Sequence, residues 1–493
     1  MDKCTSRAIN VCLLLLAFAA PMSIAATQTA WAFALLFWII RVFVVRPRPK
    51  FEKLDLAVLA FVGLSLTSSF FSYEPGVSLR KMVSVSLVTI VYLVATNLKE
   101  KKQLHRMLIL VLAGCFLACT YTFATQAIGK NLKVERLSAT GPLRLAGVEE
   151  NDTILSANGV SINSPDDLGA VFAASAGSEI PVTIYRHELI LTYKMKPEPL
   201  TATIKYDSDY FGILEWSRGR DTRASGFYGH YVTFAEALQL LASLAFGLMM
   251  VAPGQLFSRD RVLLGIVVAA AIVALFLSVT RASWLSFIVS VAIIVLLTAR
   301  LRLILICAAI AIPVIVGGLI FLQQKRQVSF FDSKDDSTTW RTMVWKEGYG
   351  VLTQNPRHML VGVGMDSLKT HWQEWHMFDD GRQPIGHMHN DYLQIAFERG
   401  IPTLVAWVVW IVLFIWAICR RLIFYAKGFK PRLDWPAYGL LIGSLGGTVG
   451  FMTSGLVHYN WGDSEVVMIL YLLMGMSLAV LRHGQNFTQE AEG

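Results

Sequence analysis

The sequence predicts an all-α polytopic membrane protein that carries one small α+β insert. Of its 493 residues, 54% are hydrophobic and only 16% are charged, whereas about 25% of the residues of a soluble domain are charged. Several apolar runs are long enough to cross a bilayer, which takes about 20 residues per helix. The formal charge of +9 falls mostly in short loops between these runs, so a membrane protein is favoured and a nucleic-acid partner is not expected.

The apolar runs predict about twelve transmembrane helices. Their expected spans are 8–25, 29–46, 54–72, 81–97, 105–127, 229–252, 261–280, 282–299, 302–322, 400–419, 436–457 and 464–481. The first run has a short basic lead like that of a signal peptide, but the many spans after it favour a retained helix. All six cysteines lie in or beside apolar runs, so a disulfide framework is not expected.

Charge predicts how these helices are oriented and how the chain divides. Lysine and arginine cluster in alternate loops, which the positive-inside rule assigns to the cytoplasm together with both termini. Two long segments fall on the opposite face. The expected order is helices 1–5 in 1–127, a first outer loop in 128–228, helices 6–9 in 229–322, a large outer loop in 323–399, and helices 10–12 with a cytoplasmic tail in 400–493.

The first outer loop contains signals of a small folded domain. Asn158-Gly159 between apolar runs is typical of a tight turn. Ser164, followed three residues later by Asp167, indicates the start of a helix. Over about 140–198 this pattern resembles a bacterial PDZ domain. PDZ domains bind an extended peptide by strand addition, so the insert has a candidate protein partner; a spacer without a peptide ligand is the alternative.

Four charged residues are expected near helix ends on the outer face: Arg223, Arg281, Arg341 and His389. An arginine close to the hydrocarbon is costly unless it is paired or functional. Because guanidinium groups bind phosphate oxygens in pairs, an anionic lipid-linked substrate would suit them.

Each of these residues also has a structural interpretation. Arg281 could anchor a helix at the interface, Arg341 could pair with a nearby carboxylate, Arg223 could belong to a basic surface, and His389 could cap or pack. His387 and His389 are two apart, as in some metal sites, but no carboxylate or cysteine cluster of suitable spacing accompanies them, so neither a metal nor another cofactor is expected.

The segment from His389 to Thr403 has the pattern His-Asn, nine residues, Gly, two residues, Thr. This pattern resembles the signature of the O-antigen ligase family, which is related to O-antigen and exopolysaccharide polymerases. Four other segments look like elements of that family: Arg223 with Gly226-Phe227, Thr280-Arg281-Ala282, Arg341 with Trp345, and the Gly-x-Gly of 361–368. The resemblance covers roughly 220–480.

The resemblance implies a metal-independent, inverting glycosyltransferase of the GT-C type in the bacterial inner membrane, with its large loops in the periplasm. The donor would be a glycan on undecaprenyl diphosphate and the acceptor a hydroxyl of lipid A-core or of a growing glycan. His389 would be the base or would orient the acceptor hydroxyl, while Arg281 and Arg341 would bind the diphosphate. The residues expected to help bind substrate are Arg223, Asn390, Tyr392 and Trp345.

Three other functions stay open at this point. A polymerase of the same superfamily, or a protein O-glycosylating relative, would share these motifs. A non-catalytic scaffold would recruit a partner through its insert but would have no need of the histidine and the arginines. A transporter is disfavoured because most of the apolar runs have no ionisable residue at their centre and no inverted repeat is apparent.

Overall fold

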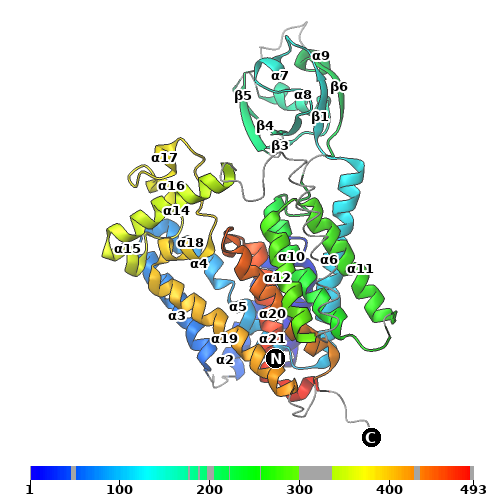
Figure 1. Ribbon diagram of the computed structural model, residues 1–493, viewed down its shortest axis with the longest axis vertical. Helices are drawn as coiled ribbons and strands as arrows, with labels where there is room; N and C mark the ends of the chain where they lie inside the picture. Colours follow the sequence, from blue (N-terminus) through cyan, green and yellow to red (C-terminus); the bar gives the residue numbers. More distant parts are fainter. Residues whose placement is uncertain are drawn as a thin grey trace. The chain divides into compact units, whose positions relative to one another are not determined.

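The computed structural model describes residues 2–45, 51–175, 178–186, 189–196, 205–220, 223–255, 257–298, 336–426 and 433–488 (Figure 1). The chain divides into two compact units. One unit comprises Met1–Ala118, Phe227–Phe276 and Thr280–Gly493, and the other comprises Cys119–Gly226 with Leu277–Val279. The helix expected at 302–322 lies outside the described residues.

Long helices form the first unit. They are α1 (Asp2–Ala19), α2 (Ile24–Val45), α3 (Lys53–Phe70), α4 (Pro75–Ser86), α5 (Thr89–Asn97), α6 (Lys101–Ile128, which continues into the second unit), α10 (Tyr231–Val251), α11 (Arg259–Leu277), α12 (Arg281–Thr298), α14 (Asp336–Gln354), α19 (Ile401–Ala426), α20 (Trp435–Ser454) and α21 (Ser464–Arg482). Among the described residues, nine helices are long and apolar enough to cross a membrane, counting α4 and α5 as one span. The predicted fold class is therefore confirmed: the chain is a mainly helical, multi-pass membrane protein.

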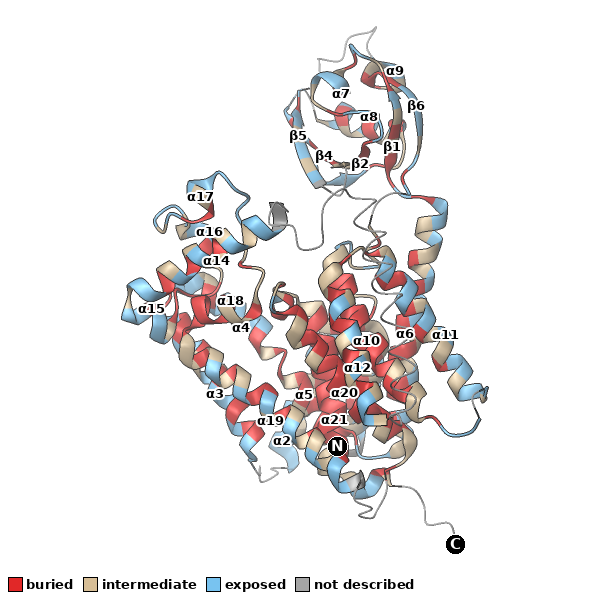
Figure 2. Ribbon diagram, viewed as in Figure 1, coloured by how far each residue is buried: buried red, intermediate tan, exposed pale blue. Residues whose placement is uncertain are grey.

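Close contact between α10 and α20 forms the buried centre of this unit, with α12 packed against both helices (Figures 1 and 2). A Cβ atom added to Gly247 would lie 2.6 Å from the Cα of Gly443, and one added to Gly443 would lie 2.8 Å from the Cα of Leu244. Small residues thus let the two backbones approach, which is how helices associate where the surrounding lipid is as apolar as the side chains.

The segment expected to lead directly into the tenth membrane helix contains a further short helix. A separate helix, α18 (Asp391–Arg399), follows Asn390 and is almost fully buried. It ends at Gly400, where φ is +85°, and α19 begins at the next residue. Glycine accepts this left-handed backbone at no steric cost. His389 therefore precedes a short helix that packs against α14, rather than standing at the mouth of a membrane helix.

Between α14 and α18 the chain forms short helices around an apolar core of its own. These are α15 (Pro356–Val361), α16 (Leu368–His371) and α17 (Phe378–Gly381). The buried core includes Val344, Val363, Met377 and Met388. It gives the loop that carries His389 a packed support of its own.

The second unit contains an antiparallel sheet. Its strands are β1 (Leu132–Leu137), β2 (Thr153–Ala157), β3 (Val160–Ser161), β4 (Ile180–Arg186), β5 (Leu189–Met195) and β6 (Ile213–Arg218). They follow the order β5-β4-β2-β1-β6, and β3 pairs with β2. The sheet thus extends beyond the expected 140–198, because β1 and β6 pair with each other from outside that range.

Helix α8 (Pro165–Ala174) packs its buried face into the core of this sheet, beside the short helices α7 (Pro142–Leu145) and α9 (Ser208–Phe211). The predicted helix start is confirmed, since Ser164 and Asp167 form a reciprocal capping box. The predicted turn is confirmed as well: Asn158 and Gly159 both have positive φ and join β2 to β3.

Candidate functional site

The backbone of Met388 is held from both sides. The indole Nε1 of Trp345, on α14, donates a hydrogen bond to the carbonyl oxygen of Met388 at 2.6 Å. The N–H of Met388 donates to Oε1 of Gln394, on α18, at 2.7 Å. The next residue, His389, is left with a φ of +46°, a conformation that costs energy for a residue with a Cβ and tends to occur at functional sites.

The two hydrogen bonds to the backbone of Met388, called the Met388 clamp below, bring two imidazoles together. The ring centroids of His387 and His389 are 4.1 Å apart, and the N–H of His389 donates to Nδ1 of His387 at 3.2 Å. Trp340 meets His389 edge to face at 5.2 Å, and Tyr459 lies 5.2 Å from the ring of His387. Aromatic rings on either side therefore fix how the histidine pair is oriented.

Arg341, in the first half of α14, adds positive charge to this cluster. Burial, followed by the charges of its neighbours, lowers the pKa of His387 to about 4 and that of His389 to about 2. The positive charge of Arg341 contributes to both shifts. Both imidazoles are consequently neutral at physiological pH. The lone pair of His387 already accepts the N–H of His389, whereas the ring of His389 has a lone pair that can accept a proton or a hydrogen bond.

Asn390 and Tyr392 hold α18 in place. The side chain of Asn390 caps α18 by accepting the N–H of Leu393 at 2.9 Å, and its Nδ2 donates to the carbonyl of Leu456 at 2.8 Å. The hydroxyl of Tyr392 donates to the carbonyl of Met452 at 3.1 Å. Both side chains thus tie α18 to the end of α20 and the loop that follows it.

The loop after α20 brings a further histidine to the cluster, one that the sequence did not single out. Nδ1 of His458 lies 2.8 Å from Oε1 of Glu236, which is on α10, and the exposed fractions of the two side chains are 8% and 2%. The charges of Arg341 and His387 act on His458 and, together with burial as the largest cause, lower its pKa to about 3. An acidic residue inside the predicted span 229–252 was the available sequence signal, because such residues are rare in membrane helices.

The other two arginines expected from the sequence are Arg281 and Arg223. Arg281 is the first residue of α12. Arg223 belongs to the second unit, in the segment next to Ala224, whose N–H donates to the carbonyl of Leu277. Glu347, a candidate partner for Arg341, instead accepts the backbone N–H groups of Phe378 and Asp379 at 2.8 Å and 3.2 Å. The charge of Arg341 thus acts on the histidines, whereas Arg281 begins α12 and Arg223 belongs to the second unit.

A metal site is not apparent in the part of the chain that the structure describes. Within that part, no three histidine, cysteine, aspartate or glutamate side chains are grouped so that they could hold an ion.

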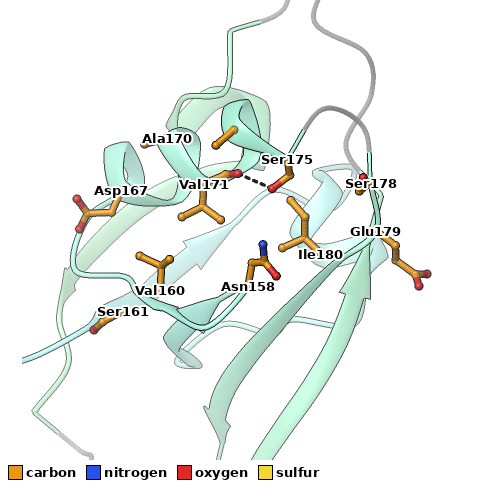
Figure 3. Close-up of a pocket in the computed structure, with 11 residues that line it drawn as sticks. Asn158, Val160, Ser161, Asp167, Ala170, Val171, Ser175, Ser178, Glu179 and Ile180 are labelled. Carbon is orange, nitrogen blue, oxygen red and sulfur yellow. Dashed lines mark hydrogen bonds between the residues drawn. The ribbon is translucent and has the colours of Figure 1, made fainter.

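The second unit has a pocket of its own, with a volume of about 580 Å³. It lies between α8, β3 and the beginning of β4 (Figure 3). Val160, Val171 and Ile180 form its apolar wall, while Asn158 and Glu179 add polar groups.

Residues 240–408 match the family model of the O-antigen ligase. This part of the chain is similar to the O-antigen ligase superfamily. Members of this family are glycosyltransferase-like enzymes, so the region carries a glycan-transfer function of the ligase or polymerase type. A comparison with curated proteins finds no match.

The O-antigen ligase region contains most of the residues expected from the sequence. Arg281, Arg341, Trp345 and His389 lie within it, together with the α18 residues discussed above. Arg223 lies before its first residue, and both members of the Glu236–His458 pair also lie outside it.

Proposed function

We propose that the protein transfers a glycan from undecaprenyl diphosphate to a hydroxyl of lipid A-core, at the periplasmic face of the bacterial inner membrane. The observation that carries this proposal is the buried cluster of neutral imidazoles around Arg341. A guanidinium suits an anionic diphosphate, and a neutral imidazole suits a hydroxyl that must lose its proton.

In the proposed reaction, the acceptor oxygen attacks the anomeric carbon from the face opposite the diphosphate. The new glycosidic bond forms as the bond to the phosphate oxygen breaks, so the configuration at that carbon inverts. Arg341 and Arg281 bind the diphosphate and stabilise the charge that develops as it leaves, and Arg223 assists. His389 takes the proton of the hydroxyl or orients that hydroxyl for attack.

Arg341 also couples donor binding to the basicity of the histidines. In the free protein its positive charge opposes a second positive charge on His389 or His387. A bound diphosphate would cancel that charge and raise the pKa of both imidazoles. The site therefore becomes basic enough to activate a hydroxyl only after the donor has bound.

Trp345, Asn390 and Tyr392 support the site mainly by positioning it. Their side chains donate hydrogen bonds to the backbone carbonyls of Met388, Leu456 and Met452 respectively. We therefore propose that they help bind substrate by fixing the loop and helix beside His389.

The insert is proposed to dock a protein partner in the manner of a PDZ domain. β6 is an edge strand of the sheet, and the side chains of Leu214 and Trp216 on it are 60% and 44% exposed. An edge strand with exposed apolar side chains can accept an extended peptide by strand addition.

The cellular experiment that tests this function is deletion of the gene, followed by gel analysis of lipopolysaccharide and of lipid-linked glycan. Loss of the capped ladder, with long chains accumulating on undecaprenyl diphosphate, is the expected result. Capping by a single repeat unit would identify a polymerase, and an unchanged profile would contradict both the ligase and the polymerase.

Because guanidinium groups take the place of a cation here, EDTA is expected to leave the transfer rate unchanged in membranes. A strict requirement for added divalent metal would contradict a metal-independent reaction.

A further inference from the structure

We propose that Glu236 and His458 form a carboxylate–imidazole dyad in which His458 takes the proton of the acceptor hydroxyl. This inference rests on the proposed glycan transfer and makes its proton acceptor specific. It leaves His389 as the residue that orients the hydroxyl.

The geometry of the pair is that of an orienting carboxylate behind a base. Oε1 of Glu236 lies 2.8 Å from Nδ1 of His458, and both side chains are buried. A carboxylate at Nδ1 holds the proton on that nitrogen and leaves the lone pair on Nε2. Within the part of the chain that the structure describes, Nδ1 is the ring nitrogen of His458 that is engaged, so the lone pair on Nε2 is available.

His389 lacks this arrangement. The groups whose charges act most strongly on it are His387 and Arg341, and its backbone N–H is used in a hydrogen bond to His387. Among the described residues, the charged groups that act on His389 therefore disfavour a proton on it. A proton on His458 would lie beside the carboxylate of Glu236, which stabilises an imidazolium as it forms.

Several other charged groups face the dyad from the elements packed around it. The groups that act on His458 are His387 in the outer loop, Arg341 on α14 and His230 at the start of α10. Three carboxylates act on Glu236: Asp391 on α18, and Asp463 and Glu465 at the start of α21. Asp463 accepts a hydrogen bond from the hydroxyl of Thr233 at 2.6 Å. The dyad thus sits between a cationic side, which suits the diphosphate, and an acidic side.

The proton balance of the step is complete. As the acceptor oxygen bonds to the anomeric carbon, its proton moves to Nε2 of His458. The electron pair of the breaking bond leaves with the diphosphate. Nδ1 keeps its proton and its hydrogen bond to Glu236. The imidazolium then returns the proton to water after the products leave.

The test is the isosteric substitution Glu236→Gln in the full-length protein, reconstituted in proteoliposomes. The substrates are the lipid-linked glycan that accumulates in cells without this gene and lipid A-core from the same cells. The dyad predicts a kcat lower by about 10²-fold or more, an unchanged KM for the donor and an altered pH profile. Glu236→Asp should recover part of the rate, because it restores a carboxylate.

Asp380→Asn is the matched control. His376 and Asp380 form a pair with the same 2.8 Å distance, but their side chains are 80% and 59% exposed, so this variant should transfer at the wild-type rate. His458→Gln should lose as much activity as Glu236→Gln, and the double variant should lose little more, because the two residues act as one unit.

A Glu236→Gln variant with wild-type kcat and pH profile would overturn the dyad. If His389→Ala were inactive in that case, glycan transfer would stand with a different proton acceptor. If His389→Ala and Arg341→Ala were also fully active, the proposed function itself would fail.

Discussion

At the residue scale, the orientation of His389 depends on hydrogen bonds made by its neighbour. Trp345 and Gln394 hold the carbonyl and the N–H of Met388 at 2.6 Å and 2.7 Å. This leaves His389 little freedom to leave its left-handed conformation. Such a site tolerates small displacements poorly, because a misplacement of about 1 Å can cost roughly 100-fold in rate.

Trp345→Phe tests this positioning. The ring still fills the space, but the hydrogen bond to Met388 is lost, so kcat should fall roughly 10- to 100-fold with little change in thermal stability. Trp375→Phe is the control, since among the described residues the Trp375 side chain makes ring contacts, with Tyr73, His358, His371 and Phe397. Equal rates for the two variants in the reconstituted transfer assay would contradict the Met388 clamp.

The low pKa values of the histidines predict an unusual pH dependence. A lowered pKa means that protonation of the free protein inactivates it only at acidic pH. The pKa values are about 4 for His387 and about 3 for His458. As the pH is lowered, kcat/KM should therefore stay constant to well below pH 6.5, which is about the ordinary pKa of histidine. Because the bound diphosphate raises these values, the acid limb of kcat should lie at higher pH. A limb near pH 6.5 in kcat/KM would contradict burial of neutral imidazoles.

Local motifs predicted part of the site. Arg341 and Trp345 belong to one motif and His389 to another. In the structure Trp345 bonds to Met388 beside His389, and the charge of Arg341 acts on His389. Glu236 and His458 are 222 residues apart, so no local pattern joins them. Their pairing arises from the packing of α10 against α20, which places the second turn of α10 beside the loop that follows α20.

At the element scale, apolar runs predicted helix positions closely, but not where a run is interrupted. The expected helix 81–97 is two pieces, α4 and α5. Near the break, the hydroxyls of Ser86 and Thr89 bond to backbone carbonyls, at Val83 and Ser86 respectively. Such side-chain bonds compete with regular helix geometry, a local effect that hydropathy does not register.

The contact between α10 and α20 makes a prediction about stability. In Gly443→Ala the new Cβ would lie 2.8 Å from the Cα of Leu244 and 2.9 Å from the carbonyl of Ser243. The helices must separate, at a cost of about 1–3 kcal/mol, so the Tm in detergent should fall. Gly63→Ala is the control, because nothing lies within 4 Å of its added Cβ. A Gly443→Ala variant as stable as Gly63→Ala would contradict the close packing.

At the scale of the whole molecule, the insert can be removed from the chain because its two ends lie close together. Its ends meet at a neck, where the N–H of Lys130 donates to the carbonyl of Gly219 at 2.8 Å and the N–H of Gly219 donates to the carbonyl of Asn131 at 3.1 Å. A short linker can therefore replace 131–218 without straining the helices on either side.

That replacement should leave transfer by the purified protein largely intact and lower activity in cells, if the insert recruits a partner. Leu214→Ser with Trp216→Ser on the edge strand should reproduce the cellular loss in the full chain. Normal lipopolysaccharide in cells carrying either version would contradict a docking role, and a purified protein without transfer activity would make the insert part of the enzyme.

The most direct test of the account is transfer by the purified protein in proteoliposomes, with lipid-linked glycan and lipid A-core supplied, comparing the wild type with His389→Ala. The wild type should form capped lipopolysaccharide. The variant should insert and fold normally but transfer at least about 100-fold more slowly, while the exposed control His376→Ala should match the wild type. Transfer at the wild-type rate by His389→Ala would remove this histidine from the reaction and contradict the site described above.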